Sequence, residues 1–220
     1  MTKIEEEQLQ KFNIDELTIK FMERIHQDNI KLIEGIEHLI DEDFDTFTKN
    51  LQEVLEATEE IKIKKAFETK IWKAKLMFSK ADRIKILKKI NNIKTLGEIL
   101  ANKLLIYRII FPDDEFKLSM KHILTSLKIL SNDLADAVKI IGTDLTKAHD
   151  ICEETKEERR KMRKEERKLL QRLWNYEMDY LSRTFLYLKE LIEGIMALGE
   201  HLKDFAEFIQ FLATKYLIFE

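Results

Sequence analysis

Two acidic residues four positions apart, Glu200 and Asp204, have the spacing best suited to chemistry. In a helix this spacing puts both carboxylates on one face, where they repel each other unless a cation or a basic side chain lies between them. Hard cations prefer such oxygen ligands, and Asn175, Glu177 and Asp179 on the preceding helix could complete a site. The spacing predicts either a divalent-metal site or a solvated helix face, and in so Glu-rich a chain it favours the solvated face when taken alone.

The histidines do not form a pattern that predicts an enzyme. A ferritin-like di-iron site needs two Glu-x-x-His pairs and two further Glu on facing helices. This chain has one such pair, Glu23 with His26, and its other histidines are scattered (His38, His122, His149 and His201). It has no Gly-rich phosphate loop, no nucleophile elbow and no Cys/His pair at a telling spacing. We therefore expect no catalytic residues and no enzymatic activity, and a di-iron metalloenzyme is the least favoured alternative.

A strongly basic run extends from Lys156 to Arg172, with nine basic and four acidic residues. Such a run can contact an acidic partner or the cytoplasmic surface of a membrane. The other interpretation is a solvated helix face, which we favour because the acids interrupt the positive field. Phe44 and Phe47, beside the acidic turn Asp41–Asp43, are expected to belong to the core rather than to a docking patch.

The elements that must position these residues are long helices. The chain has 220 residues, of which 45% are hydrophobic and 36% charged, but only five Gly and one Pro. Turn residues are too scarce for a sheet-rich domain, so we expect an all-α fold of six long antiparallel helices. Apolar residues step by three and four positions along each expected helix, as helices with one buried face require. The stripes run over residues 14–39, 47–72, 84–107, 116–148, 169–180 and 185–212.

Helix boundaries are marked by capping residues and by the single proline. Asn13 with Glu16, Ser79 with Asp82, and Thr155 with Glu158 have capping-box spacing. Pro112 disfavours a helical conformation at the residue before it and predicts the strongest boundary in the chain. A helix through residues 157–215 would be too long for a compact domain, so we expect a break near residues 182–184.

The sequence contains an internal repeat at an offset of 102 residues. The segment Leu96–Leu100 (LGEIL) recurs as Leu198–Leu202 (LGEHL). At the same offset the apolar stripes match and the two tryptophans correspond, pairing Ile90 with Ile192, Ile93 with Ile195, and Trp72 with Trp174. The repeat predicts two three-helix units, residues 1–112 and 113–220, packed as one compact body. Asn102 takes the position equivalent to Asp204, so the first unit keeps an oxygen there but loses the charge.

Composition indicates the compartment and excludes some partners. The formal net charge of −3 provides no general attraction for nucleic acid. The first residues are acidic and polar, no run of apolar residues is long enough to span a membrane, and Cys152 is the one cysteine. We expect a cytoplasmic protein with no membrane span, although peripheral membrane contact is compatible with the basic run. The continuous stripes leave room for an exposed apolar patch and hence for a homodimer.

The segment Leu188–Ile209 resembles the PhoU-like proteins, and most closely their branch associated with Pit-type phosphate transporters. That family has two repeated three-helix bundles with a Glu/Asp-x-x-x-Asp motif in each. Glu200 and Asp204 match the motif in full, and residues 175–179 resemble the acidic pattern of the neighbouring helix, with Asn175 replacing the first acid. In the first half Glu56–Glu60 and Glu98–Asn102 are degenerate versions. Because these acids can bind metal clusters in PhoU-like proteins, the resemblance implies a divalent metal or an iron cluster here.

The resemblance also implies a function. It indicates a regulator or accessory protein of phosphate transport that binds a phosphate transporter or its signalling partner. A ligand-free structural or scaffolding bundle, in which the repeat reflects duplication alone, is the alternative. If the regulator interpretation is right, the mechanism is conformational, because long packed helices can shift against each other as units.

Overall fold

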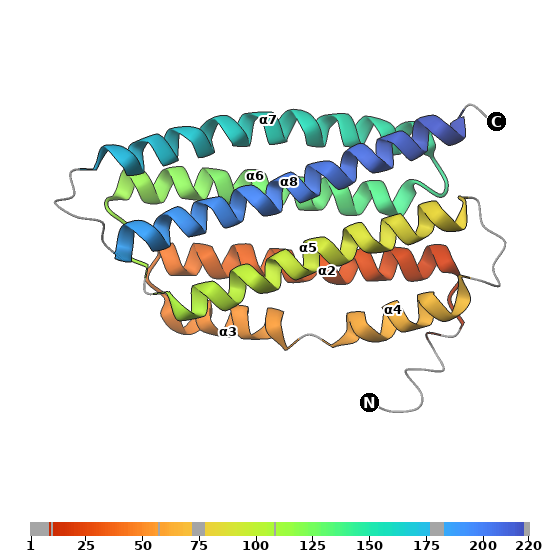
Figure 1. Ribbon diagram of the computed structural model, residues 1–220, viewed down its shortest axis with the longest axis horizontal. Helices are drawn as coiled ribbons and strands as arrows, with labels where there is room; N and C mark the ends of the chain where they lie inside the picture. The colour runs from red at the N-terminus through yellow and green to blue at the C-terminus, as the bar shows by residue number, and fades with distance from the viewer. Residues whose placement is uncertain are drawn as a thin grey trace.

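The computed structural model describes residue 9 and residues 11–56, 58–71, 78–107, 109–176 and 183–217. Over these residues the chain forms seven α-helices and no strand, so the prediction of an all-α fold is confirmed. The helices are α2 (Ile14–Ile40), α3 (Phe44–Leu55), α4 (Glu59–Lys70), α5 (Lys80–Ile106), α6 (Asp114–Ile140), α7 (Leu145–Asn175) and α8 (Arg183–Leu217). They run roughly along the long axis of the molecule (Figure 1).

The second predicted helix is interrupted, because α4 buries different residues from those that the stripe predicts. Val54 is buried at the end of α3 and Ile63 is buried in α4, whereas Ile61 from the predicted stripe is 59% exposed. The step from Val54 to Ile63 is nine residues, which in one continuous helix would turn Ile63 to the opposite side. Ending α3 at Leu55 and starting α4 at Glu59 returns Ile63, Phe67 and Ile71 to the core. The described part of the chain therefore has seven helices where six were predicted.

Two of the three predicted helix starts are confirmed, and one is wrong. Asn13 and Glu16 form a reciprocal capping box on α2, and the Ser79 hydroxyl accepts the Asp82 N–H on α5. Thr155, in contrast, is buried within α7, and its hydroxyl donates to the Ile151 carbonyl. The true start of α7 is capped by Asp144, whose carboxylate accepts the Lys147 N–H at 2.8 Å.

The boundary between α6 and α7 lies inside the predicted fourth stripe. That stripe continues through the turn because Ile141, before the turn, and Leu145, after it, are both buried. The predicted break near residues 182–184 falls at the start of the last helix. The helix α7 ends at Asn175 and α8 begins at Arg183, so Arg183 and Thr184 belong to α8 while Ser182 lies outside the described residues.

The helices form two groups that share one core. The first has α2 packed against α3, α4 and α5, and the second has α6, α7 and α8 packed against one another. The groups meet where α2 lies against α6 and α5 against α8 (Figure 1). A contiguous set of buried aliphatic and aromatic residues extends through both. No helix in the described ranges is long and apolar enough to cross a bilayer.

Candidate functional site

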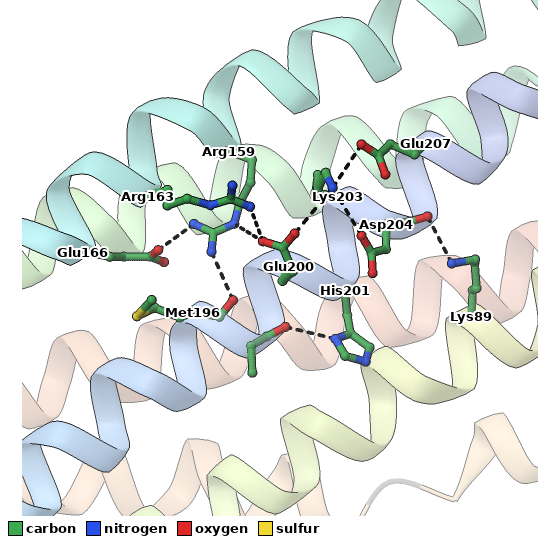
Figure 2. A network of polar contacts seen from close by, with 11 residues as sticks. Lys89, Arg159, Arg163, Glu166, Met196, Glu200, His201, Lys203, Asp204 and Glu207 are labelled. Atoms are coloured by element: carbon green, nitrogen blue, oxygen red, sulfur yellow. Dashed lines mark hydrogen bonds and ion pairs between the residues drawn. The ribbon is translucent and has the colours of Figure 1, made fainter.

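Glu200 lies in the middle of α8 and faces α7, where basic side chains surround it (Figure 2). Its Oε2 is 2.5 Å from Arg163 Nη2 and 3.5 Å from Arg159 Nε. Lys203 Nζ, one turn further along α8, is 3.4 Å from its Oε1. Burial alone would raise the pKa of Glu200, but the hydrogen bond and charge of Arg163, together with the charges of Lys203 and Arg159, outweigh it, so this pKa lies below its ordinary value. The carboxylate is therefore held charged by side chains of the protein itself.

Asp204 extends this network along α8. Its carboxylate is 3.4 Å from Lys203 Nζ, and Lys203 also reaches Glu207 at 3.0 Å. The backbone carbonyl of Asp204 accepts a hydrogen bond from Lys89 Nζ on α5 at 3.1 Å. Glu200 and Asp204 thus have a base between them, which is one of the two ways that their like charges can be tolerated on one helix face.

The network has a fully buried part that sequence analysis did not identify. Arg159 and Glu166 on α7 are 2% and 0% exposed, and Arg159 Nη1 donates to Glu166 Oε2 at 2.7 Å. Arg159 Nη2 also donates to the Met196 carbonyl of α8, while Glu166 Oε1 has no hydrogen-bond partner. Burial is the main cause that raises the pKa of Glu166. These contacts attach α7 to α8 by charge as well as by apolar packing.

The signal for this pair is present in the sequence. Arg159 and Glu166 are seven residues apart, and both continue the spacing of the buried residues of α7, which include Cys152, Thr155, Met162, Leu169 and Leu173. Two charged residues at core positions of a helical stripe indicate a buried ion pair. Arg160, Lys161 and Lys168 of the basic run are exposed, as the favoured interpretation predicts. Arg163 and Arg172 depart from it, because they pair with Glu200 of α8 and with Asp113 at the start of α6.

The corresponding region of the first half has a different arrangement. Glu98 is bound within its own helix by Lys94 at 2.6 Å, and the Asn102 side-chain amide donates to the Glu98 backbone carbonyl at 3.0 Å. Ile61 and Ala101 stand where the 102-residue offset places Arg163 and Lys203. The charged network is therefore a feature of the second half.

Comparison with known proteins places the fold. No family model matches the sequence, and no curated protein matches it. Among solved structures, a protein from Shewanella oneidensis MR-1, assigned provisionally as a PhoU-like phosphate regulatory protein, superposes with a TM-score of 0.76. The match covers 92% of this chain and 100% of that one at 10% sequence identity.

The fold is PhoU-like. This agrees with the fold implied by the resemblance at Leu188–Ile209, and at this identity the likeness concerns the fold alone.

Within the PhoU-like fold, the predicted metal ligands have the following places. Glu200 and Asp204 lie on α8, Asn175 is exposed at the last residue of α7, and Asp179 and Glu177 lie outside the described residues. Over the described ranges, no group of three or more His, Cys, Asp or Glu side chains is arranged to hold a metal ion. A divalent cation at Glu200 would meet Arg163, Arg159 and Lys203, so the described side chains in this arrangement do not fit one. The metal stays a prediction that depends on Asp179.

Two other groups that could react, the Cys152 thiol and the His26 imidazole, have pKa values shifted by burial. Burial raises the pKa of the Cys152 thiol to about 12, so it is protonated at neutral pH. His26, from the single Glu-x-x-His pair, places its Nδ1 2.9 Å from the Ser131 hydroxyl of α6, and burial lowers its pKa. The ion pairs of Glu200 join α8 to α7, so this arrangement can fix the position of α8 on α7.

Proposed function

We propose that this protein is a regulator or accessory protein of phosphate transport, and that it acts by binding a partner protein. The observation that carries the proposal is the PhoU-like fold over nearly the whole chain, in which the full Glu200/Asp204 motif lies on α8. The Shewanella protein is described as phosphate regulatory, and the resemblance at Leu188–Ile209 points to the same role. The partner is a phosphate transporter or its signalling partner at the cytoplasmic face of the membrane. If the chain belongs to the Pit-associated branch, the transporter is of the Pit type.

The proposed mechanism is conformational and involves no covalent chemistry. The charged network on α7 and α8 has several alternative pairings, since Glu200 lies within ion-pair reach of Arg159, Arg163 and Lys203. A small displacement of α8 along α7 would exchange these pairs without exposing an unpaired buried charge. Packed helices that shift between two such arrangements offer a different surface to a partner in each. A ligand-free scaffold remains the alternative, and it would not need exchangeable pairs.

The proposal is tested by phosphate uptake in the cells that carry this chain. Deleting its gene should uncouple the uptake of radiolabelled phosphate from the external phosphate supply, and the wild-type gene should restore the coupling. The Arg163→Gln/Lys203→Met variant, which removes two of the bases at Glu200, should restore it incompletely although the protein accumulates normally. If uptake and its response to supply are the same with and without the gene, the proposed function is wrong.

The metal prediction has a separate test. Melting temperatures are measured with and without Mn²⁺, Zn²⁺ and Fe²⁺ for the wild type, for Glu200→Gln/Asp204→Asn and for the control Glu193→Gln. A metal site requires a metal-induced rise that the double variant loses and the control keeps. Arg163→Gln should enlarge the rise, because the guanidinium competes with a cation for the same carboxylate. An unchanged response in the double variant would place any metal elsewhere.

A further inference from the structure

An apolar groove lies at the end of the bundle where the chain passes from α5 to α6. It has a volume of about 520 Å³ and is enclosed by the last turn of α2, the start of α3, the end of α5 and residues 109–111. This is also the passage between the two groups of helices, at the left of Figure 1. The groove therefore touches both the first group of helices and the connection that joins it to the second.

Three large apolar side chains are exposed around this groove. Phe44 is 56% exposed, Ile106 79% and Ile110 58%. They come from α3, from the last residue of α5 and from the segment that follows it, and all three line the groove. The prediction that Phe44 and Phe47 are core residues therefore holds only for Phe47, which is buried. Single exposed apolar residues need no explanation, but a group of them lining one groove marks an interaction site.

The rim of the groove is acidic. Asp41, Glu42, Asp43 and Asp45 surround Phe44 in the sequence, and all four are exposed. Lys121 pairs with Asp41 and Lys117 with Glu42, yet these two carboxylates remain 56% and 68% exposed. After the connection, Arg172 pairs with both Asp113 and Glu115 at the start of α6, and Asp114 beside them is exposed. Glu42 lines the groove itself, and the exposed acids next to Phe44 in the sequence give this edge a negative charge.

We propose that this groove binds a basic amphipathic helix of a partner protein. Such a helix inserts apolar side chains spaced by three and four residues, while its Lys and Arg residues meet the acidic rim. An anionic membrane surface is disfavoured because the rim would be repelled by its headgroups. A second copy in a two-fold dimer is disfavoured because the same acidic rim would meet itself. The inference rests on the proposed function for the existence of a partner, and on the groove for its chemistry.

The test uses the full chain and a labelled peptide of about 18 residues, built from Leu and Lys in helical spacing. Fluorescence anisotropy should show saturable binding that weakens as salt is raised, and a matched peptide of Leu and Glu should not bind. Phe44→Ser/Ile106→Ser should weaken binding by tenfold or more, whereas Phe211→Ser, which alters an equally exposed residue on α8, should leave it unchanged. Glu42→Gln/Asp45→Asn should weaken binding severalfold and reduce its salt dependence.

Several results would overturn the groove as the docking site for a basic helix. These are no binding of the Lys peptide, equal binding by the Phe44/Ile106 variant, or equal binding of the Glu peptide. If the Lys peptide does not bind, two other outcomes identify a different occupant. Binding to phosphatidylglycerol vesicles that the Phe44/Ile106 variant abolishes would assign the groove to lipid, and a dimer that this variant abolishes would assign it to self-association. The uptake experiment is independent of these readouts. Normal peptide binding with unaltered uptake in the deletion strain would overturn the proposed function and leave the groove as a docking site for a different partner.

Discussion

Arg159 and Glu166 hold two charges inside the second half of the molecule, where removing them from water is costly. Their own hydrogen bond and the donation of Arg159 to the Met196 carbonyl offset this cost only in part, since one oxygen of Glu166 has no partner. Such a pair contributes little net stability. Both residues lie on α7, so their hydrogen bond can stay intact while Glu200 of α8 exchanges partners, and the bond from Arg159 to the Met196 carbonyl holds α8 beside them.

Arg159→Met should therefore lower the free energy of unfolding by about 3–5 kcal/mol, because Glu166 is then buried without a counter-charge. Arg159→Met/Glu166→Leu, which replaces both charges by apolar groups, should recover most of that loss. Urea unfolding of Arg159→Met, Glu166→Leu and the double variant gives the coupling energy directly. Costs of the single variants that simply add in the double variant would mean that the pair is not coupled.

Asp133 provides the clearest pH dependence. Burial and the nearby acids Glu154, Asp136 and Glu158 raise its pKa from 3.8 to about 6. A carboxyl whose folded-state pKa is raised contributes stability below its ordinary pKa and loses that contribution as pH rises through about 6. Asp133→Asn should consequently be more stable than the wild type by about 1 kcal/mol at pH 7.5, after allowance for solvent screening.

The difference between Asp133→Asn and the wild type should disappear toward pH 3.5, where both side chains are neutral. Unfolding curves at a series of pH values measure it, with Asp150→Asn, a 70% exposed acid, as the control. A difference that does not vary with pH would mean that Asp133 titrates as an ordinary surface acid.

At the residue scale the sequence predicted part of the site. The spacing of Glu200 and Asp204 required a cation or a base between them, and Lys203 is a base at that place, while Arg163 pairs with Glu200 from α7. Arg159 and Glu166 were missed because the basic run was judged by its net charge and not by the helical position of each residue. Which face of α7 is buried depends on where α8 lies, and that is not a local property of the run.

At the element scale, breaks were predicted well only where the chain carries a local signal. The capping box at Asn13 and the boundary at Pro112 both coincide with helix ends. The break between α3 and α4 has no such residue, since Thr58 makes no capping hydrogen bond. Ile61, seven residues after Val54, keeps the phase of one continuous helix, so the apolar spacing concealed this break. The turn between α6 and α7 kept the phase of the stripe, so apolar spacing could not show it.

The two glycines of the repeated LGE segment give a matched test of helix packing. A Cβ on Gly97 would meet its nearest atoms at 3.6 Å or more, whereas on Gly199 it would lie 3.3 Å from Nε of the buried Arg159. Gly97→Ala should stabilise the protein by about 0.5–1 kcal/mol, because a helical glycine has a high conformational entropy in the unfolded state. Gly199→Ala should gain less or lose stability, because it presses on Arg159. Thermal melts of the two variants compare them, and equal gains would contradict the close packing at Gly199.

At the scale of the whole molecule, the two helix groups share contacts along their full length. At one end Lys215 and Tyr216 of α8 both bind the Asp82 carboxylate of α5 at 2.8 Å. In the middle Gly194 lies so close to α5 that an added Cβ would be 2.8 Å from Leu100. At the other end the rings of Tyr107 and Tyr187 stack with centroids 4.2 Å apart. The helices that the repeat assigns to separate units are thus joined from end to end.

We accordingly predict that residues 1–112 and 113–220 unfold together. Far-UV circular dichroism and amide hydrogen exchange in each half should report one transition with a common midpoint. Leu100→Ala should shift both halves equally, by about 2–4 kcal/mol, because it opens a cavity in their shared core. Two separate transitions would show that the two predicted units are independent domains, and a shift confined to the first half would show that Leu100 does not couple them.

The interruption between α3 and α4 has a mechanical consequence. At 1.5 Å per residue the 31 residues of α7 form a rod of about 46 Å, which carries a push at one end to the other. On the opposite side of the bundle (Figure 1), α3 and α4 have 12 residues each, so each forms a rod of only about 18 Å. Phe44, at the tip of α3, forms one wall of the groove. Because α3 ends after 12 residues, we expect a displacement of this wall by an occupant to reach α4 less directly than it would along an unbroken helix.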